Sequence, residues 1–494
     1  MSARRDGGSG RSAPSNGPGE AEQRPWSGRR LHFVGVGGAG MSGYARAAHA
    51  LGAVVTGSDS ALSSYAERLR ADGVLDARIG HDETNVPVGG DVEVIYSSAV
   101  LVDNPERAAA RERGLTERPR AELLGEFTAM KRTIAVAGTH GKTTTASMIV
   151  HALRAAGLQP GWLIGAPIGG DLENAAWGEG EWLVVEADES DRSMLSLHLE
   201  VGVLTNVELD HHATFGSLAE LREAFRAFLA RARTAIVVWD RPELLELAPS
   251  PVSAGVEEGA QERGVEVVPF APIEPNPIED ERSTALERSE ILQRFPWRGH
   301  EVALKIPGAH NALNATAALE AARLAGADAE RAIAGLVGFT GAGRRFQLLG
   351  ETESGAVVYD DYAHHPTEVT ATLTAARTLD RRRLVAVFQP HLYSRTALLA
   401  REFGVALALA DVVVALDVYP ARERAEDHPG VSGLLIAEAA ADASLGKPVY
   451  WLPGFAEAET VLRGVLGEGD ICLVMGAGDI DTLGRRLVGE ERDV

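Results

Sequence analysis

The sequence predicts an α/β protein of three domains, in which helices cover mostly parallel sheets. Apolar β-branched runs alternate with helical patterns along almost the whole chain. A chain of 494 residues is also too long for a single hydrophobic core. We expect a disordered tail over 1–28, a Rossmann-like first domain over 29–132, a central domain over 133–343 and a second Rossmann-like domain over 344–494.

The bulk composition is that of an ordinary soluble protein, with 45% hydrophobic and 24% charged residues. No apolar run is long enough to cross a bilayer, and residues 1–28 lack the apolar centre of a secretory signal. The single cysteine, Cys472, excludes an internal disulfide and a cysteine-rich zinc site. These features predict a cytoplasmic protein.

The formal net charge is −22, and residues 1–30 carry more Arg than acids, so the rest of the chain is more negative still. Such a body repels nucleic acid and anionic membranes, and we expect neither as a partner. An anionic substrate must therefore be held by local groups, namely helix N-termini, a few cations and Mg²⁺.

The first domain opens with a nucleotide-binding pattern. LHFVGVGGAGMSG (31–43) predicts a strand, a glycine-rich turn and a helix start, and strands follow at 53–60 and 92–100 with a helix at 66–73 between them. The glycines Gly35, Gly37 and Gly40, followed by Asp59 after the next strand, fit a dinucleotide fingerprint. That fingerprint requires a pyrophosphate and a ribose, which NAD and nucleotide sugars both supply, so both ligands stay open.

The central domain opens with a shortened phosphate loop. TIAVAGTHGKTTT (133–145) predicts a strand ending at Ala137, a turn through two glycines and a helix from Thr143. Backbone N–H groups at a helix start favour phosphate, Lys142 adds a cation, and the Thr143 hydroxyl suits Mg²⁺. An ordinary glycine turn is the alternative, but Gly-Lys-Thr at a strand-to-helix junction favours nucleotide binding. Lys142 is also one of only four lysines in the chain.

Two later strands of this domain end in acids or histidines. The strand WLVVEA is followed by four acids, Glu186, Asp188, Glu189 and Asp191. We expect one of them to coordinate or orient Mg²⁺, because open sheets bind ligands at this edge. TNVELDHH places Asp210, His211 and His212 after another strand, as candidate metal ligands, although Mg²⁺ prefers oxygen.

The remainder of the central domain is less regular. Strands are predicted at 233–240 and 300–306 and a helix at 311–326, while the Pro- and Glu-rich stretch 241–300 predicts an irregular insertion.

The third domain follows a predicted hinge strand at 341–350, with further strands at 382–390, 411–420 and 470–479. DDYAHHPTE (360–368) and FQPHLYSRT (388–396) both follow strands and gather His, carboxylate, Tyr or Arg in short loops. The guanidinium of Arg395 suits bidentate capture of a small carboxylate, so a ligand site is expected at this sheet edge.

Together these motifs resemble the ATP-dependent Mur ligases of bacterial cell-wall synthesis. From about residue 29 to the C-terminus they follow the family's order: GVGGAGMSG, GTHGKTTT, EADESD, TNVELDH, GAHNALNA, RRF, DDYAHHPTE, FQPHLYSRT and GAGDI. The shortened phosphate loop is the family's own spelling. GVGGAGM, DDYAHHP and QPHLYSR are similar to the alanine-adding branch.

The resemblance implies a UDP-sugar domain, a central ATP domain and a third domain that brings the amino acid. It implies that ATP phosphorylates the lactyl carboxylate of UDP-N-acetylmuramate to an acyl phosphate, which the amine of L-alanine attacks. Two Mg²⁺ ions are expected to offset the charge repulsion. This reaction belongs to peptidoglycan precursor synthesis.

The resemblance also implies roles by motif position. The UDP-sugar contacts are Gly37, Gly38, Ala39, Gly40, Met41, Ser42 and Asp59. The ATP contacts are Gly138, Thr139, His140, Gly141, Lys142, Thr143, Thr144, Asn311 and Asn314. Thr143 and Glu186 hold one Mg²⁺ and His211 helps to hold the second. Arg344 or Arg345 contacts the γ-phosphate, while His391 and Arg395 face the alanine carboxylate and the reacting centre.

The sequence departs from the family where His212 and Ala213 follow the Asp-His pair, which makes His212 a competitor of His211 as ligand. No lysine lies between 186 and 212, so the carbamylated lysine of several sister ligases is absent. Two rival activities remain. A cell-wall recycling ligase would attach a ready-made tripeptide to the same sugar nucleotide. An NAD-dependent oxidoreductase would use the first glycine-rich loop but leave Lys142 and Thr143 without a role.

Overall fold

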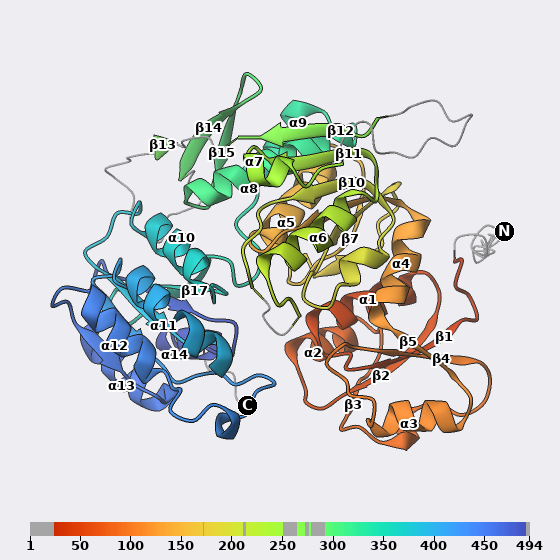
Figure 1. Cartoon of the computed structure of the whole chain (residues 1–494), viewed down its shortest axis with the longest axis horizontal. Coiled ribbons are helices and arrows are strands. Elements are labelled where there is room, and N and C mark those ends of the chain that lie inside the picture. Colours follow the sequence, from red (N-terminus) through yellow and green to blue (C-terminus); the bar gives the residue numbers. More distant parts are fainter. Residues whose placement is uncertain are drawn as a thin grey trace, which may run out of the picture. The chain divides into compact units, whose positions relative to one another are not determined.

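The computed structural model describes residues 24–170, 172–210, 214–249, 264–271, 276–277 and 292–490 (Figure 1). Its contacts divide the chain into two compact units, Met1–Pro119 and Arg120–Val494. Most of the tail predicted over 1–28 lies outside the described residues. Residues 24–28, however, belong to the fold, because Trp26 is buried and its N–H donates to the Leu51 carbonyl at 3.0 Å.

The first unit is a parallel five-stranded sheet with the strand order β3-β2-β1-β4-β5. Its strands are β1 Arg30–Val34, β2 Val54–Asp59, β3 Arg78–Ile79, β4 Val92–Tyr96 and β5 Thr116–Pro119. Its helices are α1 Ala39–Ala50, α2 Ser64–Ala71 and α3 Pro105–Glu112, with a 3₁₀ turn η1 at Glu83–Asn85. The strand order reverses beside β1, so the turn from β1 to α1 lies at a topological switch point, the usual ligand edge of such sheets.

The second unit begins with a seven-stranded sheet in the order β12-β11-β10-β6-β9-β7-β8, parallel except for β8. Its strands are β6 Arg132–Ala137, β7 Gly161–Leu163, β8 Ala175–Ala176, β9 Trp182–Glu186, β10 Leu199–Leu204, β11 Ala232–Trp239 and β12 Glu266–Phe270. The helices are α4 Arg120–Met130, α5 Lys142–Ala155, α6 Leu218–Leu229, α7 Pro242–Leu245, α8 Ala309–Leu324 and α9 Ala329–Val337. Helix α5 packs against α8 and α9, and their apolar faces share one core with β6, β9 and β10.

The domain boundary near Arg132 stays a prediction. The division by contacts comes earlier, after Pro119, because α4 packs against the turn η2 (Ser193–Ser196) and strand β6.

The irregular insertion expected over 241–300 is wrong for its described residues. Strand β12 extends the central sheet in parallel with β11, and β14 (Gln293–Trp297) forms an antiparallel hairpin with β15 (His300–Leu304). A two-residue strand, β13 (Asn276–Pro277), pairs with β14. Pro269 is tolerated in β12 because β12 is an edge strand, where a missing N–H breaks no central ladder.

The C-terminal part of this unit is a six-stranded sheet in the order β16-β17-β21-β18-β19-β20, in which only β16 is antiparallel among the described strands. Its strands are β16 Gln347–Glu351, β17 Val357–Asp361, β18 Leu384–Phe388, β19 Val412–Ala415, β20 Val449–Trp451 and β21 Ile471–Met475. The helices are α10 Pro366–Ala376, α11 Tyr393–Leu407, α12 Leu434–Ala443, α13 Phe455–Val465 and α14 Asp481–Leu487, with a 3₁₀ turn η4 at Ala425–Asp427. Alternate β18 side chains join two separate cores, one with α10 to α12 and one with α13 and α14, so the sheet is covered on both faces. The predicted three-domain α/β class is thereby confirmed.

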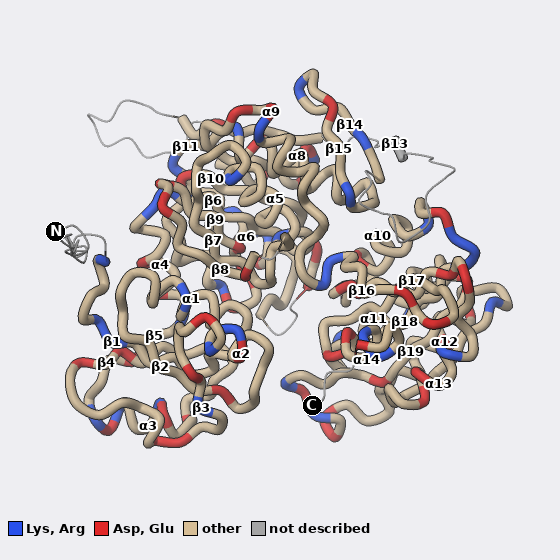
Figure 2. The backbone as a smooth tube through the Cα atoms, turned by 180° about the vertical axis from the view of Figure 1, so that it is seen from behind, with Lys and Arg blue, Asp and Glu red and all other residues tan. Residues whose placement is uncertain are grey.

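Acidic and basic residues are interspersed over the described elements of both units (Figure 2). Among the helices of the described part of the chain, none is long and apolar enough to cross a membrane.

Candidate functional site

The phosphate loop connects β6 to α5 and needs both of its glycines. Gly138 has φ 132°, and a Cβ there would lie 2.1 Å from the Thr205 hydroxyl. Gly141 has φ 81°, and a Cβ there would lie 2.8 Å from the Asn314 amide oxygen. Gly141 is the N-cap of α5, and no described side chain caps that helix start. The first N–H groups of α5 are therefore suited to an anion.

Lys142, the first residue of α5, turns its ammonium group back over this loop. Nζ donates to the carbonyls of Gly138 at 2.7 Å and Thr139 at 3.1 Å, and to Glu189 Oε2 at 2.9 Å. Burial disfavours its charge, but the nearby carboxylates outweigh burial and raise the pKa of Lys142. Burial also raises the pKa of Glu189 to about 7, although the Lys142 charge opposes that rise.

Thr143 and Glu186 meet at the end of β9. The Thr143 hydroxyl donates to Glu186 Oε1 at 2.8 Å, and the other oxygen accepts from the Gly165 N–H at 2.8 Å. Two oxygen donors side by side at a helix start form a donor set that a hard cation such as Mg²⁺ prefers.

The other predicted ATP contacts surround this loop. Asn311 and Asn314 are buried in the first turns of α8, and the Asn311 amide donates to the Pro307 carbonyl at 2.7 Å. The Thr139 hydroxyl donates to the Glu208 carbonyl at 2.9 Å, and Thr144 is buried in α5.

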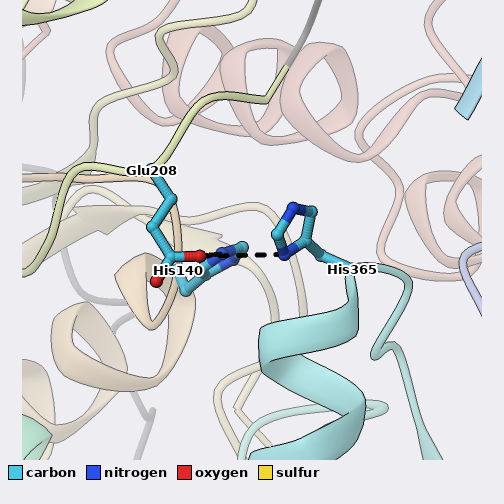
Figure 3. Close-up of side chains that lie close together, drawn as sticks. All are labelled: His140, Glu208 and His365. Carbon is cyan, nitrogen blue, oxygen red and sulfur yellow. Dashed lines mark hydrogen bonds and ion pairs between the residues drawn. The ribbon is translucent and has the colours of Figure 1, made fainter. Parts of the chain in front are cut away.

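His140, in the same loop, joins the central sheet to the C-terminal part of the unit (Figure 3). Its Nε2 lies 3.3 Å from Glu208 Oε2, and its Nδ1 lies 3.3 Å from Glu368 Oε1. His365 Nδ1 lies 3.8 Å from the same Glu208 oxygen, and the two imidazole ring centroids are 4.8 Å apart. We call His140, Glu208, His365 and Glu368 the junction cluster.

The junction cluster is strongly polarised. Burial lowers the pKa of His140, but the hydrogen bonds that its ring donates to Glu208 and Glu368 outweigh burial and raise it to about 9. The hydrogen bond from His140 lowers the pKa of Glu208 to about 2. Burial, and then the nearby His140 charge, lowers the pKa of His365. One positive charge is thus held between two carboxylates.

Arg395 lies in the first turn of α11, not in a loop as expected. Its Nη2 donates to Asp210 Oδ1 at 2.6 Å, and both side chains are 5% exposed. Its Nη1 lies 3.4 Å from His391 Nδ1. Burial, reinforced by the Arg395 charge, lowers the pKa of His391 to about 4, so His391 is neutral near pH 7.

The two candidate γ-phosphate arginines differ in their surroundings. Arg344 donates to Asp360 at 3.0 Å and to the carbonyls of Gly476 at 2.8 Å and Gly478 at 2.7 Å. Arg345 lies 3.7 Å from Glu368 and 5.1 Å from the centre of the Tyr362 ring. Arg344 is therefore anchored inside the C-terminal sheet, whereas Arg345 is held by a longer ion pair and an aromatic face.

In the first unit, the glycine-rich turn is held by its predicted acid. The Gly37 N–H donates to Asp59 Oδ2 at 2.8 Å, and the Ser63 hydroxyl donates to the Gly37 carbonyl at 2.8 Å. Gly38 is the N-cap of α1, where no described side chain accepts from the helix start. The other expected sugar-nucleotide contacts form the first turn of α1, namely Ala39, Gly40, Met41 and Ser42.

A buried carboxylate on α3 lies beneath this sheet edge. Glu106 is fully buried, 2.7 Å from His32 Nε2, from His81 Nδ1 and from the Ser58 hydroxyl. Burial raises its pKa, but the hydrogen bonds from His32, Ser58 and His81 outweigh burial and lower it.

Three members of the junction cluster, Glu208, His365 and Glu368, were not selected as site residues from the sequence. Their acidic and histidine side chains stand in the motifs TNVELDHH and DDYAHHPTE. The two motifs lie far apart in the chain, however, and only the fold brings them together. The predicted metal ligand His211 and its competitor His212 lie outside the described residues.

Known proteins resemble this chain over nearly its whole length. Three family models match: "Mur ligase family, catalytic domain" at 30–132, "Mur ligase middle domain" at 136–322 and "Mur ligase, glutamate ligase domain" at 344–478. A UDP-N-acetylmuramate–L-alanine ligase of Rubrobacter xylanophilus is 43% identical over 93% of this chain and 99% of its own. One of Mycolicibacterium vanbaalenii is 40% identical over 96% and 98%.

The solved structure of the UDP-N-acetylmuramate-alanine ligase of Thermotoga maritima superposes with a TM-score of 0.74 at 29% identity, covering 93% of this chain and 98% of the other. With the phosphate loop, the order of motifs and the three α/β sheets, these matches establish that the chain belongs to the Mur ligase family.

Proposed function

We propose that this chain joins L-alanine to the lactyl carboxylate of UDP-N-acetylmuramate at the expense of ATP, in the cytoplasm, during synthesis of peptidoglycan precursors. The observation that carries the proposal is the phosphate loop between β6 and α5, with Lys142 above it and Thr143 beside Glu186. It belongs to a chain that matches alanine-adding ligases over 93% of its length or more.

ATP binds with its phosphates on the first turn of α5. The backbone N–H groups of this turn surround the phosphate oxygens. The Lys142 ammonium, which donates to two loop carbonyls in the structure, then donates to the phosphate oxygens instead. The two asparagines of α8, Asn311 and Asn314, bind the nucleotide. Arg345 supplies the γ-phosphate contact more readily than Arg344, whose guanidinium already donates to Asp360 and two carbonyls.

Mg²⁺ fits the pair formed by the Thr143 hydroxyl and the Glu186 carboxylate, and a second ion is assigned to the segment of His211. When bound, the metal offsets the negative charge of the γ-phosphate and of the approaching carboxylate. The protein orients its two oxygen ligands through α5 and through the Gly165 N–H on Glu186.

The chemistry is a phosphoryl transfer followed by an acyl transfer. A lactyl carboxylate oxygen attacks the γ-phosphorus, and ADP leaves. The alanine ammonium then loses one proton to water, and the resulting amine attacks the acyl carbon. Phosphate leaves with the bonding electron pair, and the new amide nitrogen releases a second proton to water. Arg395 binds the alanine carboxylate, while the neutral imidazole of His391 lies beside it and can accept a hydrogen bond from the incoming ammonium.

The sugar nucleotide binds in the first unit, at the turn from β1 to α1. Its pyrophosphate lies on the start of α1, which no described side chain caps, and Asp59 contacts the ribose. The oxidoreductase alternative gives no role to the phosphate loop. The tripeptide-ligase alternative differs only in the amino component.

The deciding experiment measures ADP release by the purified chain with UDP-N-acetylmuramate and, in turn, L-alanine, glycine, L-serine and the tripeptide. Turnover with L-alanine well above all the others is expected. Preferential turnover with the tripeptide would instead identify the chain as the recycling ligase that attaches a tripeptide to the sugar nucleotide. A melting-temperature rise with UDP-N-acetylmuramate but not with NAD separates the sugar-nucleotide site from the dinucleotide alternative.

A further inference from the structure

We propose that His140, Glu208 and His365 form a binding site for a zinc-class divalent ion, distinct from the Mg²⁺ site at Thr143 and Glu186. The inference does not rest on the ligase reaction. It rests on the geometry and donor chemistry of the junction cluster (Figure 3).

The three ligand atoms are close enough to share one ion. His140 Nε2, Glu208 Oε2 and His365 Nδ1 all lie within 4.8 Å of one another, and the two distances to the Glu208 oxygen are 3.3 and 3.8 Å. Metal–ligand bonds of about 2.1 Å in a tetrahedral site separate neighbouring donor atoms by roughly 3.4 Å. The three donor atoms therefore already lie near the spacing of a tetrahedral site.

The donor set selects the metal. Two imidazole nitrogens and one carboxylate are the ligands of zinc and its first-row neighbours, whereas Mg²⁺ requires oxygen ligands. Three protein ligands also leave a fourth position for water. Glu208 is 40% exposed, so the ion has a route from solvent.

The groups around the ligands are those that support a metal-bound histidine. Glu368 faces His140 Nδ1 at 3.3 Å, on the opposite side of the ring from the proposed metal. A carboxylate in that place fixes the imidazole orientation and strengthens its other nitrogen as a donor, once that nitrogen has released its proton to the solvent on metal binding. The Thr367 hydroxyl donates to Glu208 Oε2 at 2.6 Å, which orients that carboxylate in the same way.

His365 already presents the nitrogen that the metal needs. It is the N-cap of α10, and its Nδ1 accepts the Thr367 N–H at 3.4 Å, so that nitrogen carries no proton. A hydrogen bond of that length is weak, and giving its lone pair to a metal costs little.

An ion at this site connects three separate segments of the second unit: the phosphate loop, the segment after β10 and the start of α10. Because the unfolded chain does not hold these ligands together, the bound ion stabilises the folded unit by mass action.

The experiment measures Zn²⁺ binding to the full-length protein against a chromophoric chelator, in a millimolar excess of Mg²⁺. The variants are His365→Ala, which removes a ligand, and Glu208→Gln, which keeps the shape but weakens the donor. The matched control is His428→Ala, because His428 lies 3.8 Å from Glu423 as a His–Glu pair outside the cluster. Circular dichroism checks that every variant is folded.

The wild type and His428→Ala should bind one more Zn²⁺ than His365→Ala, or bind it at least about 100-fold more tightly. Co²⁺ should give a visible absorption band in the wild type that both cluster variants lose, and Zn²⁺ should raise the melting temperature only where the site is intact. Ions bound elsewhere are common to all variants and cancel in the comparison. Identical titrations for the wild type, His365→Ala and Glu208→Gln would overturn the proposal and leave the cluster as a hydrogen-bonded ion pair only.

Discussion

The ammonium group of Lys142 is held by two loop carbonyls and by Glu189, all within 3.1 Å. This arrangement keeps the cation above the helix start, where phosphate oxygens replace the carbonyls once ATP binds. The chain contains only four lysines against many arginines, so a compact point charge occurs at few positions.

Replacing Lys142 by Ala should lower ligation by at least about 10²-fold, because it removes a charge that stabilises the transferring phosphoryl group. Lys447→Ala is the matched control, since its Nζ also donates to two carbonyls, those of Ala408 and Ala410, far from the phosphate loop. ADP release and melting temperature are measured for both variants. Near-normal turnover of a folded Lys142→Ala protein would contradict the proposal that this loop binds the ATP phosphates.

Arg395 and Asp210 form a buried ion pair in which each side chain is 5% exposed, and the pair joins α11 to the segment after β10. A lysine at 395 keeps the charge opposite Asp210 but loses the planar fork that can grip a second carboxylate. Arg395→Lys should therefore raise the KM for alanine much more than the KM for ATP.

Saturation curves with alanine varied at fixed ATP, and the reverse, test this expectation. Arg377→Lys serves as the control, because Arg377 pairs with Asp411 at 3.0 Å in the same C-terminal sheet but away from the site. Equal shifts in both KM values, or none, would mean that Arg395 serves only as the partner of Asp210.

At the scale of single elements, helix α8 carries a half-buried titratable group, His310, in its first turn. Burial lowers the pKa of His310 to about 4, against an opposing effect of Glu368. In the unfolded chain this imidazole takes up its proton near pH 6.5. The stability it contributes is therefore complete above pH 6.5 and is lost as the pH falls from 6.5 towards 4.

His310→Gln should make the free energy of unfolding fall less steeply over that interval, because the variant no longer gains a proton on unfolding. Urea unfolding at a series of pH values measures the slope. The exposed His198 gives the control variant His198→Gln, which should keep the wild-type slope. Parallel pH profiles for the wild type and His310→Gln would contradict the lowered pKa of His310.

Many central strands of the three sheets were predictable, because β18 and β21 are continuous apolar runs and β1, β6 and β10 are mostly apolar, and each ends before a glycine or a polar residue. The edge strands β3 and β12 were not. β3 has two residues, and β12 contains Pro269, so neither carries a period-2 signal. Short or proline-containing edges owe their strand conformation to the neighbouring strand.

The candidate site also contains a part that was predictable from the sequence and a part that was not. The phosphate loop is local, so its spacing could be read directly from residues 138–144. The junction cluster and the pair Asp210–Arg395 join segments more than a hundred residues apart, and no local pattern states which segments meet. Arg395 was expected in a loop because its segment follows a strand and is rich in polar groups. The helix start had no sequence signal, because the N-cap Leu392, at φ 70°, is not a usual capping residue.

At the scale of the whole molecule, the chain consists of two compact units with separate cores. The first unit relies on the buried group around Glu106, in which His32 and Glu106 are each at most 1% exposed. Removing one member of such a group leaves buried polar partners without their hydrogen bonds.

Glu106→Ala should destabilise the first unit by about 1–3 kcal/mol for each buried partner that it leaves without a hydrogen bond. Glu112→Ala, at an exposed position of the same helix α3, should have little effect. Calorimetry with and without ATP–Mg²⁺ distinguishes the units, because the nucleotide should still stabilise the second unit of Glu106→Ala by the wild-type amount. If ATP–Mg²⁺ no longer stabilised the second unit of Glu106→Ala, the two units would not unfold independently of each other.

The pair Lys142–Glu189 has a consequence for the heat of nucleotide binding. Burial already brings the pKa of Glu189 to about 7, with the lysine charge holding it down. When the ammonium turns towards the phosphates, that restraint weakens, and Glu189 takes up a proton from the solution. Calorimetric titrations of ATP in two buffers with different ionisation enthalpies should therefore give different apparent binding enthalpies, and Glu189→Gln should reduce the difference.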